Sequence, residues 1–281
     1  MIDLHVHSTC SDGTVTPTEL IRLAEEVGVS AVALCDHNTV EGLSEFLEAA
    51  RGSKVEAVPG VEFSTDYEGK ELHILGLFIT EDAYDSIKSL LSDMLERKEE
   101  SNRALVRNLN NAGIRLDYDR IKASAAGVVN RAVIGAEMVR LGYCETVKEA
   151  FKNWLAPVHG FFQPPERLET LETIAFIRSV GAVSVLAHPF LSLEEQRLRR
   201  FLEKAVPVGL DAMEVWYGEF SPEQTQLAKD IAEEFGLLPS GGSDFHGGNK
   251  PGLDLGVGRG KLQVPDFCLE LLARRRKEKR K

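Results

Sequence analysis

The sequence predicts an α/β fold in which a barrel-like series of strands and helices is interrupted once by a helical insertion. In the first 80 residues, short apolar runs rich in β-branched residues alternate with longer helical patterns. From about residue 85 to residue 163 the pattern is helical and mostly amphipathic, and the alternation then resumes. Alternating strands and helices indicate a parallel sheet with helices outside it.

The first part of the barrel is expected to contain two helices and four strand segments. The first helix has a clear start, because Thr16 is a suitable N-cap, Pro17 takes the first helical position and Glu19 completes a capping box. Gly28 can end this helix. The second helical pattern covers residues 40–51. The strand segments are residues 2–6, 30–35, 56–64 and 71–79.

The rest of the barrel is expected after the insertion. Its apolar runs lie at residues 182–190, 211–217 and 237–247, and they alternate with helical patterns at 171–181, 198–206 and 221–236. We therefore assign residues 1–84 and 164–281 to the barrel and residues 85–163 to the helical insertion. The basic tail from Arg274 to Lys281 is expected to be the frayed, solvated end of the last helix.

Composition excludes several classes of protein. The formal net charge of the 281 residues is −11, which argues against a surface built to wrap nucleic acid or bind anionic lipid. The four cysteines form no CxxC pair, so neither a zinc ribbon nor a thioredoxin-like motif is indicated. No apolar run approaches the length of a membrane span, and the polar N-terminus has no secretory pattern. We expect a cytoplasmic protein that has no membrane association and no evident obligate protein partner.

Metal-ligating side chains gather at the ends of the predicted strands. His5 and His7 are two residues apart, so both imidazoles point to the same face of a strand. The other residues of this kind follow or begin later apolar runs, and they are His37, Glu62, His73, His188, Asp244 and His246. Parallel barrels keep their active sites at the carboxyl ends of the strands. The pattern therefore predicts an open, catalytic metal cluster rather than separate hydrogen-bonded side chains.

The combination of donors indicates which metals could bind and which kind of reaction they would support. Imidazoles and carboxylates suit manganese, zinc or iron, and Glu62 can bridge two ions. We expect two or three divalent cations, with Mn²⁺ foremost and Zn²⁺ or Fe²⁺ as alternatives. Such cations lower the pKa of a bound water and neutralise charge on a phosphoryl transition state. They also give an acidic protein the positive potential that a phosphate needs.

The motifs together resemble one family. DLHVHSTCSDG, CDH, PGVE, LHILG, LAHP and GGSDFHG are similar to the motifs of the PHP (polymerase and histidinol phosphatase) superfamily, in particular its small stand-alone phosphoesterases. The resemblance implies a distorted (β/α)7, TIM-like barrel with a metal site at its C-terminal face, which we expect the insertion to cover. It also implies a metal-dependent phosphatase similar to nucleoside 3',5'-bisphosphate phosphatases, acting through a metal-bound hydroxide.

The resemblance also implies how the ligands are shared. His5, His7, Glu62 and Asp244 would hold the first ion, and Glu62 with His73 and His188 would hold the second. Asp12, His37 and His246 would hold the third and take part in catalysis. Asp12 stands where some members of the family have histidine, which is a tolerable exchange for manganese or zinc.

Two positions depart from the family pattern and concern the substrate. Many members carry an RPH sequence in the insertion, where this chain has Arg131-Ala132-Val133, and a later histidine of the family corresponds to Phe220. Arg131 is a candidate phosphate clamp because of its fork geometry, and Arg103 is a second, weaker candidate. The alternative for both is an ordinary surface arginine on a helix.

The substrate therefore remains a choice between phosphate esters. The leading hypothesis is a small phosphomonoester, such as a nucleotide or a nucleoside 3',5'-bisphosphate, or a sugar or amino-alcohol phosphate. A second is 5'-3' exonuclease action on short RNA, and a third is a non-catalytic metal-binding module. Amide hydrolysis is a fourth, although the motifs resemble phosphoesterases more closely.

Overall fold

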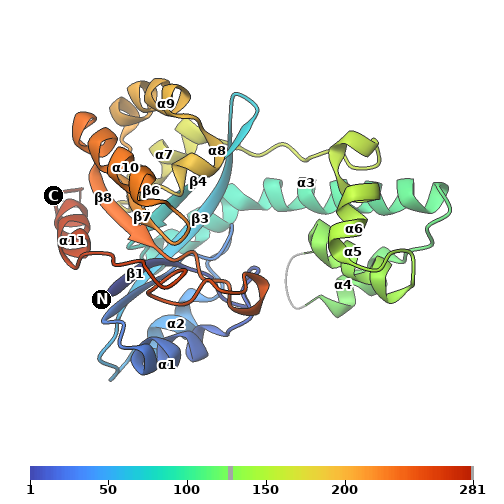
Figure 1. Ribbon diagram of the computed structural model, residues 1–281, viewed down its shortest axis with the longest axis horizontal. Coiled ribbons are helices and arrows are strands. Elements are labelled where there is room, and N and C mark those ends of the chain that lie inside the picture. The colour runs from blue at the N-terminus through green and yellow to red at the C-terminus, as the bar shows by residue number, and fades with distance from the viewer. Residues whose placement is uncertain (126–128, 280–281) are drawn as a thin grey trace. The chain divides into compact units, whose positions relative to one another are not determined.

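The computed structural model describes residues 1–125 and 129–279 (Figure 1). These residues form two compact units, and we describe each by itself. The barrel unit comprises Met1–Lys88 with Arg167–Lys281, and the helical unit comprises Ser89–Glu166.

The sheet of the barrel unit is a nearly closed barrel of seven strands. In spatial order they are β1 (Ile2–Val6), β2 (Ala31–Leu34), β3 (Glu56–Tyr67), β4 (Lys70–Leu77), β6 (Val183–Leu186), β7 (Ala212–Tyr217) and β8 (Leu238–Gly242), and the short β5 (Leu168–Glu169) pairs with β3. The barrel closes just beyond β8, where the His7 amide donates to Phe245 O (2.9 Å) and the Asp244 amide donates to His5 O (2.9 Å). The predicted distorted, TIM-like α/β barrel is confirmed.

One strand does not fit the prediction of a parallel sheet. β4 is antiparallel to both neighbours, because β3 and β4 form a hairpin. The two residues of its turn, Glu68 and Gly69, have φ values of 51° and 76°. Positive φ at both central positions is typical of the tight turns that match the twist of paired strands. The Asp66 carboxylate accepts the Gly69 amide (2.8 Å) and holds the turn.

Five of the described helices of the barrel unit lie where the sequence predicts helical patterns. The helices of this unit are α1 (Pro17–Val27), α2 (Leu43–Ala49), α7 (Thr170–Ser179), α8 (Pro189–Ser192), α9 (Glu195–Val208), α10 (Pro222–Glu234) and α11 (Phe267–Lys279), with 3-10 turns at Glu81–Ala83 and Gly247–Asn249. The predicted start and end of α1 are confirmed, since Thr16 caps it reciprocally with Glu19 and Gly28 ends it with φ 77°. Within residues 1–125 and 129–279, no helix combines the length and the apolar composition of a membrane span.

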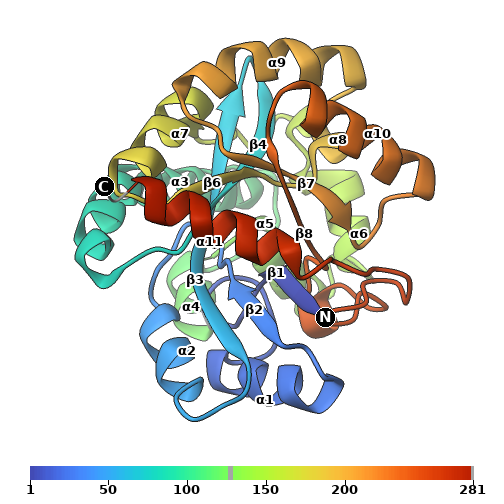
Figure 2. The same ribbon diagram turned by 90° about the vertical axis from the view of Figure 1, so that its left-hand side faces the viewer.

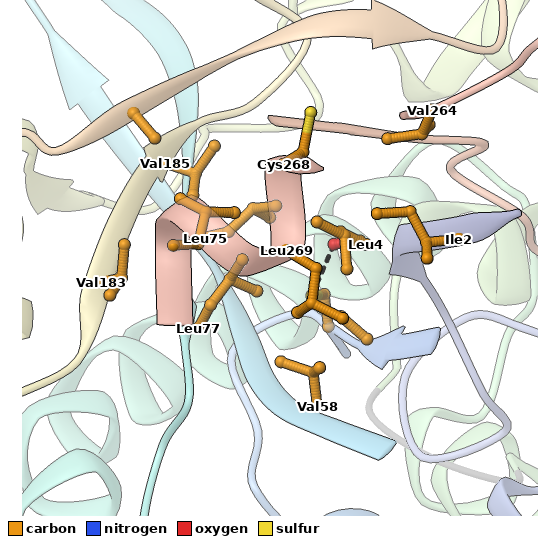
Figure 3. Packing of buried hydrophobic residues seen from close by; sticks show 14 of the residues in the cluster. Ile2, Leu4, Val58, Leu75, Leu77, Val183, Val185, Val264, Cys268 and Leu269 are labelled. Atoms are coloured by element: carbon orange, nitrogen blue, oxygen red, sulfur yellow. Dashed lines mark hydrogen bonds between the residues drawn. The ribbon is translucent and has the colours of Figure 1, made fainter. Parts of the chain in front are cut away.

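Helix α11 closes the barrel at the end where its parallel strands begin (Figure 2). Cys268, Leu269 and Leu272 are buried against apolar side chains that point into the barrel (Figure 3). These side chains include Ile2, Leu4, Val58, Leu75, Leu77, Val183 and Val185. Because apolar packing fills this end of the barrel interior, a metal site inside the barrel is expected at the opposite end.

The prediction that the basic tail is frayed and solvated is wrong for two of its residues. The Lys279 ammonium donates to Asp211 and to Ala182 O, and Arg275 lies 3.5 Å from the second oxygen of Asp211. Asp211 is buried directly before β7, so these cations neutralise a buried carboxylate at the start of that strand. Arg280 and Lys281 lie outside the described residues.

The helical unit has a hydrophobic core of its own. Its elements are α3 (Tyr84–Asn111, of which the first five residues belong to the barrel unit), α4 (Tyr118–Ser124), α5 (Arg131–Arg140), α6 (Val147–Ala150), a π-helical turn (Phe151–Leu155) and a 3-10 turn (Pro157–His159). Leu105, Leu109, Ile134 and Met138 are fully buried in this core. Residues 126–128 are not described.

Gly242 offers a direct test of how closely β8 approaches β1. A Cβ atom at this position would lie 2.4 Å from His5 Cβ and 2.5 Å from the His5 amide nitrogen, so the backbone would have to move. We expect Gly242→Ala to destabilise the protein by about 2–3 kcal/mol, as overpacking does. Chemical denaturation measures this, with Gly248→Ala as the control because its nearest neighbour would lie at 3.7 Å. Equal stability of the two variants would contradict the close approach.

Candidate metal centre

The donor side chains converge at the end of the barrel where the parallel strands finish. His5 lies on β1 and His7 follows it, and both are fully buried. Their Nε2 atoms are 3.1 Å apart, so the two rings point to one place, as their spacing predicts. A buried strand end with two converging imidazoles is typical of a ligand pair.

Glu62 is the centre of the cluster, and its buried carboxylate faces five imidazoles. Its Oε1 lies 2.8 Å from His73 Nδ1 and 3.1 Å from His188 Nε2. Its Oε2 lies 3.1 Å from His7 Nε2, 3.1 Å from His37 Nδ1 and 3.3 Å from His5 Nε2. A carboxylate with both oxygens surrounded in this way has the geometry of a bridging ligand.

The antiparallel direction of β4 explains how His73 reaches this cluster. His73 pairs with Ser64 near the turn of the β3–β4 hairpin. In a parallel strand, a residue this close to the start would lie at the opposite end of the barrel. Because β4 runs backwards, its first half lies beside the carboxyl ends of its neighbours.

Asp12, His246 and Asp244 complete the set. His246 Nε2 lies 3.2 Å from Asp12 Oδ1, and His37 Nε2 lies 3.8 Å from Asp12 Oδ2. Asp244 Oδ1 lies 3.3 Å from His7 Nε2 and 3.4 Å from His246 Nδ1. The structure thus brings all nine predicted ligands together, in four overlapping groups. The groups are His7–Asp12–His37–His246, His5–His7–Asp244, His5–Glu62–His188 and His37–Glu62–His73.

Buried donor atoms without hydrogen bonds show that the cluster fits metal ions. Among the described residues, His7 Nδ1, His37 Nδ1 and Glu62 Oε2 are buried and make no hydrogen bond. A buried polar atom without a partner is costly, whereas a lone pair aimed at a cation is stabilised. The mixture of imidazole and carboxylate donors suits manganese, zinc or iron.

The charges of the metal-free cluster are shared between carboxylates and imidazoles. Burial opposes ionisation of Glu62, but His37, His5 and His73 hold its pKa well below the usual range. Burial also opposes protonation of His7, yet the nearby carboxylates of Asp244 and Glu62 raise its pKa to about 9. For His73, burial again opposes protonation, but the Glu62 carboxylate raises its pKa to about 10. For His37 burial dominates and lowers the pKa to about 3.

These shifts predict that metal affinity depends on pH. His7 and His73 carry protons in the metal-free protein at neutral pH because their folded pKa values are raised, and a cation must displace those protons. The apparent affinity for Mn²⁺ is therefore expected to rise by at least roughly tenfold per pH unit between pH 6 and pH 8. Titration calorimetry in buffers of different ionisation enthalpy would count the protons released. An affinity independent of pH would contradict the assignment of these two ligands.

Three residues at the cluster have left-handed backbone conformations. Asn38, His188 and Asp244 have φ values of 52°, 27° and 59°. Such strain in residues other than glycine is typical of functional sites. The buried Glu214 holds one of them, because its Oε2 accepts the His188 amide (2.6 Å) while its Oε1 lies 2.9 Å from His5 Nδ1.

Glu214 was missed from the sequence, although a signal was present. It is an acidic residue in the middle of the apolar strand β7. Its bond to His5 Nδ1 leaves Nε2 directed at the cluster, which is how carboxylates orient metal-bound histidines. Asp36 positions a loop instead of an imidazole. Its carboxylate accepts hydrogen bonds from the Ser8 amide (2.8 Å) and the Ser8 hydroxyl (2.6 Å), and these bonds fix the loop that carries Asp12.

Phe220, where family members have a histidine, belongs to an aromatic group beside the cluster. Its ring centroid lies 5.0 Å from that of Tyr217 and 5.2 Å from that of Phe190. Tyr217 in turn donates its hydroxyl to Asp244 Oδ2 (2.8 Å). The phenyl ring thus supports the position of a residue that contacts a candidate ligand.

The two candidate phosphate-binding arginines lie in the helical unit. The guanidinium of Arg131 is 4.3 Å from the centroid of Phe162 and donates to Leu155 O (3.3 Å). Arg103 pairs with Glu99 (3.1 Å) and Asp119 (3.0 Å) and lies over Tyr118. These contacts show that both side chains are held within their unit, and their role toward a substrate stays a prediction.

Comparisons with known proteins agree on the kind of protein. The PHP domain profile matches residues 3–162. A 5'-3' exoribonuclease of Haemophilus influenzae is 35% identical over 87% of this chain and 89% of its own length. A 3',5'-nucleoside bisphosphate phosphatase of Chromobacterium violaceum is 28% identical over 91% of this chain and 90% of its own length. A structure described as a metal-dependent phosphoesterase from Bifidobacterium adolescentis superposes with a TM-score of 0.82, at 27% identity and 97% and 95% coverage.

Proposed function

The chain belongs to the PHP domain family and is a metal-dependent phosphoesterase, and we propose that the nine-residue cluster around Glu62 hydrolyses phosphate esters of nucleotides. The observation that carries the proposal is the convergence of five imidazoles on one buried carboxylate whose Oε2 has no hydrogen-bond partner. The complete set of donors argues against a non-catalytic module.

We propose that the cluster holds two or three divalent cations, Mn²⁺ foremost. The ligand sets are His5, His7, Glu62 and Asp244 for the first ion, Glu62, His73 and His188 for the second, and Asp12, His37 and His246 for the third. Two of the four geometric groups agree with this assignment. His5, His7 and Asp244 lie together, which supports the first ligand set, and Asp12, His37 and His246 lie together, which supports the third. His7 also lies with the last group and His37 with Glu62, so these two imidazoles would be shared between neighbouring ligand sets.

Bound cations supply an activated water and neutralise the charge that develops on the phosphoryl group. The residues of the chain provide the frame for this chemistry. Glu214 fixes the ring of His5, and Tyr217 fixes Asp244. Burial of Glu62 and His7 keeps competing solvent from the donor atoms and strengthens their electrostatic effect.

The leading substrate is a phosphomonoester of a nucleotide, and specifically a nucleoside 3',5'-bisphosphate. The bisphosphate phosphatase of C. violaceum, which matches nine-tenths of this chain, supports this choice. In this proposal Arg131, and less strongly Arg103, binds the second phosphate of the substrate. Val133 in place of the family histidine is expected to weaken that contact.

A second candidate is 5'-3' exonuclease action on short RNA. Its support is the higher identity, 35%, of the exoribonuclease of H. influenzae over nearly the full length of both chains. Both reactions hydrolyse a phosphate ester of a nucleotide and would use the same cluster. They differ in the bond that breaks and hence in the products.

One experiment separates the candidates. Manganese-loaded protein is incubated with nucleoside 3',5'-bisphosphates, mononucleotides and short 5'-phosphorylated RNA, and the products are resolved by chromatography. Inorganic phosphate from the bisphosphates without RNA shortening would support the phosphatase, and a ladder of mononucleotides from RNA would support the exonuclease. No product from any of these esters by protein with full metal content would overturn the proposed nucleotide substrates.

A further inference from the structure

Lys250 stands at the border between the ligand cluster and solvent, and nothing in the proposed function yet uses it. It follows His246 after the short turn Gly247–Asn249. Its ammonium lies 2.6 Å from Asp244 Oδ2, and 37% of its side chain is exposed. It is therefore a cation that contacts a candidate metal ligand and is also accessible from outside.

The backbone before Lys250 is fixed to the loop that carries Asp12. The Gly248 amide donates to Thr14 Oγ1 (2.8 Å), and the Asn249 side-chain amide donates to Asp12 O (2.8 Å). A Cβ atom on Gly247 would lie only 2.2 Å from Thr14 Oγ1, so the two segments are in close contact. The position of the Lys250 backbone is thus defined, while its four-carbon side chain can still adjust.

Asp244 has other contacts besides Lys250 that hold its carboxylate. Its Oδ1 faces the cluster, 3.3 Å from His7 Nε2, and its Oδ2 already accepts the hydroxyl of Tyr217 (2.8 Å). The Lys250 ammonium has three donors, and within the described part of the chain its side chain makes one hydrogen bond, to Asp244. Two donors are thus left for a ligand that approaches from solvent.

We propose that Lys250 binds a non-bridging oxygen of the substrate's phosphoryl group. This inference rests on the proposed phosphoesterase function. A phosphoryl group at the cluster would lie close to Asp244 Oδ1, and the Lys250 ammonium is separated from that oxygen by one carboxylate group. A lysine ammonium binds phosphate as a compact point charge and needs no fixed fork geometry. Lys250 would supply the binding cation from within the barrel unit itself.

The test measures phosphate binding separately from turnover. Inorganic phosphate is titrated calorimetrically into manganese-loaded wild type, Lys250→Met and Lys250→Arg, with metal content measured for each. Lys250→Met is expected to bind phosphate roughly tenfold more weakly and to lose a similar factor in kcat/KM, at unchanged metal content. Lys250→Arg is expected to recover most of the affinity. Lys204→Met is the matched control, because Lys204 pairs with Glu68 (3.0 Å) away from the cluster.

The outcomes distinguish this inference from the proposed function. Unchanged phosphate affinity in Lys250→Met, at full metal content, would overturn the inference even if the wild type is active. A loss of metal from Lys250→Met would also overturn it, because the lysine would then act by holding Asp244. Lysine-dependent phosphate binding by a wild type that hydrolyses no ester would support the inference while the proposed function fails.

Discussion

The Glu62→Gln variant is expected to lose phosphoesterase activity by at least about a thousandfold. The two carboxylate oxygens of Glu62 face five imidazoles that come from four other strands or strand ends. Oε2 faces His5, His7 and His37, and Oε1 faces His73 and His188. An amide removes the negative charge and replaces one acceptor by a donor. The volume hardly changes, so the loss would come from the cluster and not from a cavity.

The same variant is expected to lose metal. Elemental analysis after gel filtration should show at least one divalent cation fewer per chain than in the wild type, since Glu62 belongs to two of the proposed ligand sets. Glu68→Gln is a matched control, because Glu68 is an exposed carboxylate in the turn between β3 and β4. A Glu62→Gln protein with wild-type metal content and activity would refute the central role of this carboxylate.

Removal of the metal is expected to lower the melting temperature by about 10 °C. Ligands that bind only the folded state stabilise it by roughly 4 kcal/mol at a thousand times Kd, and each kcal/mol corresponds to about 2–4 °C in a chain of this size. The folded state loses the binding free energy of the ions, and the buried carboxylates of Glu62 and Asp244 then keep only protonated imidazoles and Lys250 as counter-charges. Differential scanning fluorimetry with EDTA, and then with Mn²⁺ restored, measures the effect.

Glu62→Gln again supplies the control for this prediction. Its melting temperature should respond much less to EDTA than that of the wild type. An identical melting temperature of the wild type with and without chelator, at demonstrated metal removal, would mean that the ions do not stabilise the fold.

Local signals in the sequence were sufficient for much of the fold. Thr16, Pro17, Glu19 and Gly28 specify the ends of α1 through hydrogen bonds within four residues, so they act without tertiary context. The sequence also predicts that His5 and His7 point to the same side, since the two-residue period of a strand fixes which side chains share a face. These features depend only on neighbours in the chain.

Of the features that were missed, one is a local turn with an unusual sequence and the others depend on partners far away in the chain. The β3–β4 hairpin has a Glu-Gly turn in place of the usual Asn-Gly or Asp-Gly, so residues 56–79 were assigned to parallel strands. Glu214 is 209 residues from its partner His5, and Lys279 is 68 residues from Asp211. Periodicity cannot show such pairings, because the same acidic or basic residue on the surface would give the same pattern.

The most direct test of the metal centre is an anomalous difference map from crystals of the manganese-loaded protein. We predict two or three peaks among the nine side chains, each within about 2.0–2.4 Å of its ligand atoms, and one pair of peaks bridged by Glu62. A map without peaks at Glu62, from crystals that contain manganese elsewhere, would contradict the account.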